Sequence, residues 1–260
     1  MNLGLAGQRV VLCGANGILG RAIAKQLADE GATLALLGRS REALDKLAHE
    51  LVGAVTHTTF ECDLAAANST DRAVEHAERV LGGLDIFISA AGAARGGVFW
   101  EIDDAAWRSN LEIKLFGTIR ALRAVTPRMV RQRSGRIVLV VGNSARQPEP
   151  RMLPGAAANA ALLAIVRGLA EELGPHGVAI NAVNPGPVRS SRWDTLMQTA
   201  AAREGCSIAE AESKFLAKTA LRRLATAEEV ATHVAFLASP AAAHLTGTSL
   251  TIDGGSTKSP

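Results

Sequence analysis

Three glycines near the start of the chain are spaced to form a phosphate-binding turn. Gly14, Gly17 and Gly20 follow a short apolar segment, and a helical pattern follows them. Glycine lets the backbone turn sharply and lets a ligand approach closely, because it has no Cβ. The helix behind the turn would offer unpaired N–H groups and the positive end of its dipole, which favour a phosphate group. The stretch is interpreted as a nucleotide site. The alternative is a glycine-rich corner without a ligand, because the spacing is not G-x-G-x-x-G.

Arg39 lies at the position where dinucleotide-binding sites distinguish NAD(H) from NADP(H). In such sites a group about 20 residues beyond the glycines meets the adenosine ribose. An NAD site has a carboxylate there, but this chain has Arg39 and no acidic residue at the end of the apolar segment 32–37. A guanidinium pairs with a 2′-phosphate, which a carboxylate would repel. The sequence therefore favours NADP(H) over NAD(H), the alternative being a solvated Arg39 in a turn.

Alternating strand and helix patterns position these residues along the whole chain. Apolar runs typical of buried parallel strands alternate with apolar repeats of helical period. This order predicts an α/β fold, a single doubly wound Rossmann-type domain over residues 1–260. The expected strands after the first are 32–37, 55–61, 84–88, 136–141, 178–183 and 249–252, and the expected helices after the first are 41–51, 69–81, 103–133, 154–173 and 226–238.

Small and polar residues follow the expected strands, at the edge of the sheet where a dinucleotide lies in such folds. Asp63 follows one strand and could accept a hydrogen bond from the adenine amino group, and Ala91 and Gly92 leave room for a ligand at the tip of another. The predicted cofactor-binding residues are Gly14, Asn16, Gly17, Ile18, Gly20, Arg39, Ser40, Asp63, Leu64, Ala90, Ala91, Gly92, Pro185, Gly186 and Val188.

Composition excludes several classes of partner. The 260 residues are 48% hydrophobic with a net charge of +3, and the basic residues are scattered, so we expect no nucleic-acid surface. Three cysteines lie far apart in the sequence and indicate neither a metal site nor a disulfide framework, which fits a cytoplasmic protein. No run approaches about 18 uninterrupted apolar residues, so no membrane span is expected.

Further motifs resemble those of the short-chain dehydrogenase/reductase family over nearly the whole chain. Besides the glycine turn they are Leu84–Gly92, Gly135–Val138, Asn181–Gly186 and Asp253–Gly255, in the family's order and spacing. The resemblance implies a Rossmann-type fold of about seven parallel strands and a bound nicotinamide dinucleotide. It also implies a homo-oligomer, a tetramer or a dimer, formed through the two long helices.

The catalytic residues that the resemblance implies are absent. The family uses a Tyr, a Lys four residues later, a Ser before them and an Asn on the preceding helix. The corresponding positions here are Gly155, Asn159, Gly142 and Lys114, and the chain contains no tyrosine. No shift of the alignment can therefore recover the family's acid.

Lys114 and Asn159 suggest an exchange of roles, since the family has Asn and Lys at these positions. Our hypothesis is that Lys114 supplies the cation from the neighbouring helix; the alternative is drift in a degenerate site with Lys114 at the surface. Asn143 and Ser144 follow the lost serine and are candidate donors to a substrate oxygen, or else turn residues that bond their own backbone. The candidate catalytic residues are Lys114, Asn143, Ser144 and Asn159.

Three functions remain open from the sequence. The first is an NADP(H)-dependent oxidoreductase that passes hydride between nicotinamide and a carbonyl or alcohol, with a non-standard acid/base site. The second is a non-redox isomerase or lyase on the same scaffold, and the third is a catalytically silent NADP-binding protein. Residues 189–221 are expected to cover a small-molecule substrate whose identity the sequence does not give.

Overall fold

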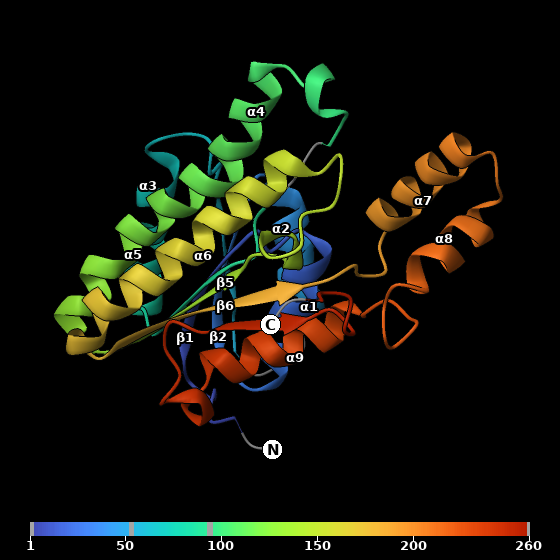
Figure 1. The fold of residues 1–260 in the computed structure, drawn as a ribbon. Coiled ribbons are helices and arrows are strands. Elements are labelled where there is room, and N and C mark those ends of the chain that lie inside the picture. The colour runs from blue at the N-terminus through green and yellow to red at the C-terminus, as the bar shows by residue number, and fades with distance from the viewer. Residues whose placement is uncertain (1–2, 52–54, 93–95, 259–260) are drawn as a thin grey trace.

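The computed structural model describes residues 3–51, 55–92 and 96–258, which form a parallel sheet between two layers of helices (Figure 1). The sheet has seven strands in the order β3-β2-β1-β4-β5-β6-β7, and every neighbouring pair is parallel. The order reverses between β1 and β4, so a crevice opens at the carboxyl ends of these strands, where ligands bind in such sheets. The expected doubly wound fold is confirmed.

The strands are β1 (Arg9–Cys13), β2 (Thr33–Gly38), β3 (Thr58–Glu61), β4 (Ile86–Ser89), β5 (Gly135–Val140), β6 (Val178–Pro185) and β7 (Ser249–Ile252). The α-helices are α1 (Ile18–Asp29), α2 (Arg41–Glu50), α3 (Ser69–Leu81), α4 (Asp104–Leu111), α5 (Gly117–Gln132), α6 (Leu153–Leu173), α7 (Ser191–Glu204), α8 (Ile208–Leu216) and α9 (Ala227–Ala238). Most expected boundaries lie within two residues of these. The predicted strand 55–61 begins only at Thr58, and the strand from Val178 continues to Pro185.

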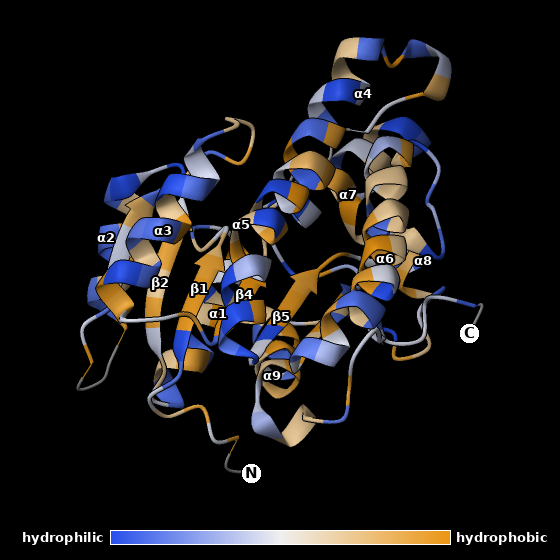
Figure 2. Ribbon diagram, turned by 90° about the vertical axis from the view of Figure 1, so that its left-hand side faces the viewer, coloured by the Kyte–Doolittle hydropathy of each residue, from blue (hydrophilic) through white to orange (hydrophobic). Residues whose placement is uncertain are grey.

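The core has one apolar cluster on each face of the sheet. One joins the sheet to α1 and α9, and the other joins it to α3, α5 and α6. Figure 2 shows the hydrophobic strands between helices whose outer faces are more polar. Because side chains alternate along a strand, Val183 of β6 belongs to the first cluster and Ile180 and Ala182 belong to the second. The two faces of β6 are thereby assigned to specific helices.

The predicted long helix 103–133 contains an interruption that its periodicity does not show. A π-helical turn, Glu112–Phe116, lies between α4 and α5, and the Gly117 N–H donates to the Glu112 carbonyl five residues back. The Thr118 hydroxyl donates to the Lys114 carbonyl at 2.7 Å. A π turn inserts one extra residue and rotates the side chains that follow, and such turns are frequent at functional sites. It sets the position of Lys114, while Pro127 is accommodated inside α5.

Residues 189–221, expected to cover the site, form the hairpin of α7 and α8. The hairpin projects beyond the carboxyl edge of the sheet (Figure 1), and its Trp193 and Met197 form a small apolar cluster with Leu224, which follows it. Its two ends meet, because the Arg189 N–H donates to the Ala225 carbonyl at 3.1 Å. The hairpin therefore leaves the sheet and returns to it at one place.

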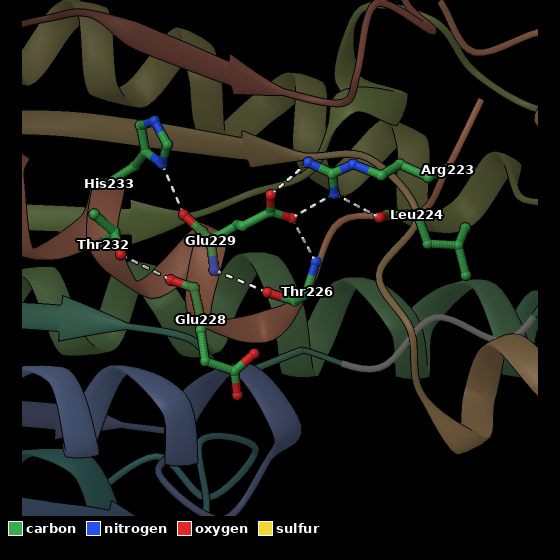
Figure 3. Close-up of polar contacts among 7 residues, drawn as sticks. All are labelled: Arg223, Leu224, Thr226, Glu228, Glu229, Thr232 and His233. Carbon is green, nitrogen blue, oxygen red and sulfur yellow. Dashed lines mark hydrogen bonds and ion pairs between the residues drawn. The ribbon is translucent and has the colours of Figure 1, made fainter. Parts of the chain in front are cut away.

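The returning end of the hairpin is fixed by the start of α9 (Figure 3). Thr226 and Glu229 form a capping box, in which the Thr226 hydroxyl accepts from the Glu229 N–H and the Glu229 carboxylate accepts from the Thr226 N–H. Arg223 also donates to both oxygens of Glu229, at 2.8 and 2.6 Å. The Arg223 guanidinium and the Thr226 N–H lower the pKa of Glu229 to about 2. The segment that follows α8 is thus tied to the body of the protein.

Candidate active site

The glycine turn packs directly against the end of β4. A Cβ on Gly14 would lie 2.6 Å from the Ala91 nitrogen, and Gly14 has φ +79°, a conformation that side chains rarely adopt. A Cβ on Gly20 would lie 2.1 Å from the Gly14 carbonyl oxygen. Gly17 differs, because it is the N-cap of α1 without a side-chain cap and a Cβ there would meet only the Gly14 oxygen, at 3.5 Å. The turn is closely packed below and open at the start of α1, beginning with Ile18, as a phosphate site requires.

Arg39 lies beside this turn with its charge available. Its side chain is exposed and has no hydrogen-bond or ion-pair partner among the described residues. The Asn16 amide donates to the Ser40 carbonyl at 3.2 Å, which fixes the turn against the end of β2, while Asn16 Oδ1 is buried without a partner in the described chain. An unpaired buried acceptor and a free guanidinium fit the ribose hydroxyls and the 2′-phosphate of NADP.

Asp63 and Leu64 differ in what they could offer a cofactor. Asp63 is exposed, and its Oδ1 accepts from the Ala65 N–H at 3.0 Å, so Oδ2 remains available. Leu64 is 7% exposed, and its carbonyl accepts from Arg120 at 2.9 Å, so it helps to hold α5 in place. Asp63 therefore suits adenine recognition, and Leu64 mainly positions the loop.

Lys114 points into the protein and reaches the carboxyl ends of two strands. Its Nζ donates to the main-chain carbonyls of Val140 at 3.0 Å, Val141 at 3.2 Å and Ala91 at 3.5 Å. Desolvation, with a smaller contribution from the positive charge of Arg192, lowers the pKa of Lys114 from 10.5 to about 8. Carbonyl dipoles hold the ammonium but do not neutralise it, so its charge remains available to a ligand.

Ser144 and Asn159 form a second polar pair beside Lys114. The Asn159 Nδ2 donates to the Ser144 Oγ at 2.9 Å. Since that oxygen accepts from the amide, the hydroxyl proton of Ser144 is free to point elsewhere. A Cβ on Gly142 would lie 2.9 Å from Asn159 Nδ2, so the glycine at the family's serine position makes room for this amide.

Asn143, by contrast, bonds away from this pair. Its Nδ2 donates to Ser256 Oγ at 3.2 Å, and Lys258 N–H donates to Gln147 Oε1 at 2.8 Å. The side chain of Asn143 therefore anchors the C-terminal segment to the loop after β5. Of the four candidate catalytic residues, the structure brings Lys114, Ser144 and Asn159 to the carboxyl edge of the sheet and engages Asn143 elsewhere.

The loop after β6 closes the crevice opposite the glycine turn. The Gly186 N–H donates to the Ile252 carbonyl at 2.9 Å, and a Cβ on Gly186 would lie 2.6 Å from the Cβ of Asp253. Val188 pairs with Ala225 at the base of the α7–α8 hairpin. Pro185, Gly186 and Val188 thus occupy the edge where Ala90, Ala91 and Gly92 follow β4, two strands away.

Asn184 is a polar residue that the sequence analysis missed. It is completely buried next to Pro185 at the end of β6, and neither polar atom of its side chain has a hydrogen-bond partner among the described residues. Asn184 lies within the motif Asn181–Gly186 that carries the family resemblance, but that motif gave no reason to single out its side chain.

Outside this site, the structure was compared with what binding to another subunit, a membrane or a metal ion would require. An apolar groove of about 400 Å³ runs between α5 and α6, lined by residues that include Ile119, Leu122, Ile165 and Leu169. By length and composition Leu153–His176 could cross a membrane, but it packs along the sheet with 44% of its most apolar window buried. No cluster of three or more metal-ligating side chains occurs within residues 3–51, 55–92 and 96–258.

Comparison with known proteins gives likenesses over nearly the full length. A family model described as enoyl-(acyl carrier protein) reductase matches residues 14–257. An uncharacterized oxidoreductase of Bacillus subtilis (strain 168), YvrD, is 32% identical over 98% of this chain and 98% of its own. The structure of L-sorbose reductase from Gluconobacter frateurii, complexed with NADPH and L-sorbose, has a TM-score of 0.92 and 26% identity, covering 100% of both chains. NAD+-bound xylitol dehydrogenase has a TM-score of 0.90 and 25% identity, covering 96% of this chain and 99% of its own.

Proposed function

Because this chain belongs to the short-chain dehydrogenase/reductase family, we propose that it is an NADP(H)-dependent oxidoreductase whose acid/base groups are Lys114 and Ser144. Hydride would pass between the nicotinamide and the carbonyl or alcohol of a small molecule. The observation that carries the proposal is the inward-pointing ammonium of Lys114, held by three main-chain carbonyls at the ends of β4 and β5. A lysine that had drifted to the surface would not be held in this way.

The residues around the crevice fit a nicotinamide dinucleotide. The open start of α1 at Gly17 would hold the pyrophosphate, and Arg39 would pair with the 2′-phosphate. When bound, the cofactor supplies or accepts the hydride. Structural relatives occur with NADPH and with NAD+, so the preference for NADP(H) rests on Arg39 and on the absence of a carboxylate at the end of β2.

In the proposed mechanism Lys114 supplies positive charge and Ser144 supplies a proton donor. The Lys114 ammonium is held where it would stabilise negative charge that develops on the substrate oxygen, or bond the ribose hydroxyls. The Ser144 hydroxyl, which accepts from Asn159, would donate its proton to that oxygen and recover one from solvent. General acid–base assistance contributes roughly 10²–10⁴-fold, so the missing tyrosine leaves hydride transfer possible at a lower rate.

The α7–α8 hairpin would cover the substrate, and α5 and α6 would join subunits. Arg192, in the first turn of α7, lies close enough to lower the pKa of Lys114, which brings the hairpin toward the site. The apolar groove between α5 and α6 supports a homodimer or homotetramer that buries this surface.

Cofactor binding and turnover test the proposal together. NADPH binding is measured by fluorescence, and NADPH oxidation is then followed by absorbance with a panel of carbonyl compounds. Binding with oxidation is the expected result. Binding without oxidation of any carbonyl would favour a non-redox or silent protein, and absence of binding would refute the cofactor assignment.

A further inference from the structure

Asn184 has an unsatisfied amide in the interior of the protein. Its side chain is 0% exposed, and neither Nδ2 nor Oδ1 has a hydrogen-bond partner in the described chain. Buried polar groups are nearly always paired with protein or with an ordered water molecule. The structure therefore calls for a small polar partner next to this amide, of the size and kind that a buried water provides.

The alternation of β6 shows which way Asn184 points. Ile180 and Ala182 belong to the apolar cluster beneath α6, and Val183 belongs to the cluster on the opposite face. Asn184 continues the series of Ile180 and Ala182, so its side chain faces α6. It is the last side chain on that face before the strand ends at Pro185.

The first turns of α6 lie over that end of the strand. The helix connects β5 to the parallel strand β6, so it runs back across the sheet from the carboxyl edge. Leu162 and Val166 pack in the cluster with Ile180 and Ala182. The preceding turns of the helix, which contain Gly155 and Asn159, therefore lie toward the level of Asn184, and residues 155–158 bring little side-chain volume there.

Asn159 also has a buried side-chain atom without a hydrogen-bond partner. Its Nδ2 donates to Ser144 Oγ at 2.9 Å, but its Oδ1 is buried without a partner in the described residues. One water molecule between the two amides could accept from Asn184 Nδ2 and donate to Asn159 Oδ1. Asn184 Nδ2 would then gain an acceptor and Asn159 Oδ1 would gain a donor.

We propose that Asn184 is a positioning residue, which binds one water molecule together with Asn159 and thereby fixes the orientation of the Asn159 amide. This inference rests on the proposed function of Ser144. With Asn159 Nδ2 toward Ser144, the serine hydroxyl is free to donate to the substrate. With the amide reversed, Asn159 Oδ1 would accept that proton and withdraw it from the reaction.

A crystal structure of the full chain at high resolution tests the water directly. An ordered water within hydrogen-bond distance of both Asn159 Oδ1 and Asn184 Nδ2 is expected. A direct bond between the amides, or bonds from Asn184 to other protein atoms, would overturn the inference.

Thermal unfolding of Asn184→Leu gives a second test that needs no substrate. Leucine is close in size to asparagine and has no polar side-chain atoms. If no water is bound and the Asn184 amide is simply unpaired, the substitution removes a buried polar group without a partner, and Tm should rise. If the water link exists, Asn159 loses its partner and Tm falls. In an Asn159→Ala background the fall should disappear, because the two residues act through one network.

Turnover separates positioning from stability. Turnover is measured with the carbonyl compound that the wild type reduces fastest. Asn184→Leu should lower kcat about tenfold and leave the KM for NADPH unchanged. Asn184→Ser can still form a hydrogen bond to a water molecule, so it should recover part of the lost activity. The matched control is Asn181→Leu. Asn181 is also buried on β6, but it bonds Leu245 and Thr248 on the other face, so its loss should lower Tm and leave kcat intact.

The outcomes distinguish this inference from the proposed function. If the wild type oxidises no NADPH, the proposed function fails, while the crystal structure and the Tm values still decide whether the water links the two amides. An unchanged kcat in a folded Asn184→Leu would refute the positioning role even in an active enzyme.

Discussion

The side chain of Lys114 crosses Gly92 so closely that a Cβ on Gly92 would lie 2.7 Å from Lys114 Cδ and 2.9 Å from Nζ. Gly92 follows β4, and Lys114 lies in the π turn between α4 and α5. The glycine thus provides the space through which the lysine reaches the carbonyls of Val140 and Val141. This relationship links the cofactor side of the crevice to the residue proposed to act in it.

Substitution of Gly92 by Ala should displace the Lys114 ammonium without altering Lys114 itself. The flexible lysine would swing away from the added methyl group and lose its carbonyl partners. We expect NADPH oxidation to fall about tenfold, since misplaced catalytic groups lose much of their effect. Gly82→Ala is the control, because Gly82, like Gly92, has a positive φ (+73° against +159°), but a Cβ there meets nothing within 4 Å. Equal activity of the two variants would show that the position of Lys114 does not matter.

Lys114→Met should remove most of the activity while the protein stays folded. Methionine fills a similar volume, and loss of a group that stabilises the reacting oxygen should cost roughly 10²-fold in turnover. Lys25→Met, which removes a surface lysine paired with Asp29, is the control. Turnover and NADPH affinity are measured for both; wild-type values for Lys114→Met would refute the proposed role.

The lowered pKa of Lys114 predicts the pH dependence of the reduction. Below pH about 8 the ammonium is charged, and above it the amine is neutral. Reduction that needs the charge should therefore be steady near pH 7 and fall as the pH rises through about 8. The fall should be missing from the residual activity of Lys114→Met, and a wild-type profile that stays level to pH 9.5 would exclude the ammonium as the required form.

The lowered pKa of Lys114 also affects stability, and here the effect of raising the pH is opposite to its effect on activity. The unfolded chain keeps the lysine proton up to pH about 10.5, but the folded protein releases it near 8. Between these values the unfolded state binds more protons, so this group makes the free energy of unfolding rise with pH. Denaturant unfolding of wild type and Lys114→Met at pH 7 and 9.5 checks this, because wild type should gain relative to the variant at the higher pH.

Arg39→Ala should weaken NADPH binding roughly 10- to 100-fold and leave NADH binding nearly unchanged, because only NADPH carries the 2′-phosphate that the guanidinium would pair with. Arg41→Ala is the matched control, since Arg41 is already paired with Asp45. Fluorescence titration with both cofactors measures the effect. Equal losses for NADPH and NADH would assign Arg39 a general role and remove the basis for NADP preference.

Leu169→Glu should dissociate the expected oligomer by placing a charge in the apolar groove between α5 and α6. Leu196→Glu, on the partly exposed Leu196 of α7, is the control. Sedimentation of the wild type and both variants gives their masses. A monomeric wild type would contradict the assembly proposal.

Much of this structure could be predicted from the sequence because it depends on local patterns. Alternating strands and helices predicted the sheet, and the expected helix 226–238 matches α9, whose N-cap is Thr226. The glycine turn was identified by its spacing, and the structure shows why Gly14 tolerates no side chain.

The rest depends on contacts between distant segments, which no local pattern encodes. The apolar residues keep their helical period through the π turn, so the sequence does not show it. The structure shows it through the hydrogen bond from the Gly117 N–H to the Glu112 carbonyl. Asn143 looked equivalent to Ser144 in the sequence, but its partner Ser256 lies 113 residues away. Asn184 carried no signal, because its significance lies in the partners that its side chain lacks.

The hydrogen bond between the Arg189 N–H and the Ala225 carbonyl affects which changes of sequence the protein can accept during evolution. A segment whose two ends lie side by side can be exchanged for another without changing the path of the chain on either side. We therefore expect the residues between these ends to behave as an interchangeable module, separate from the glycine turn and Arg39. Chimeras that carry the hairpin of a relative should therefore bind the same dinucleotide and accept different small molecules.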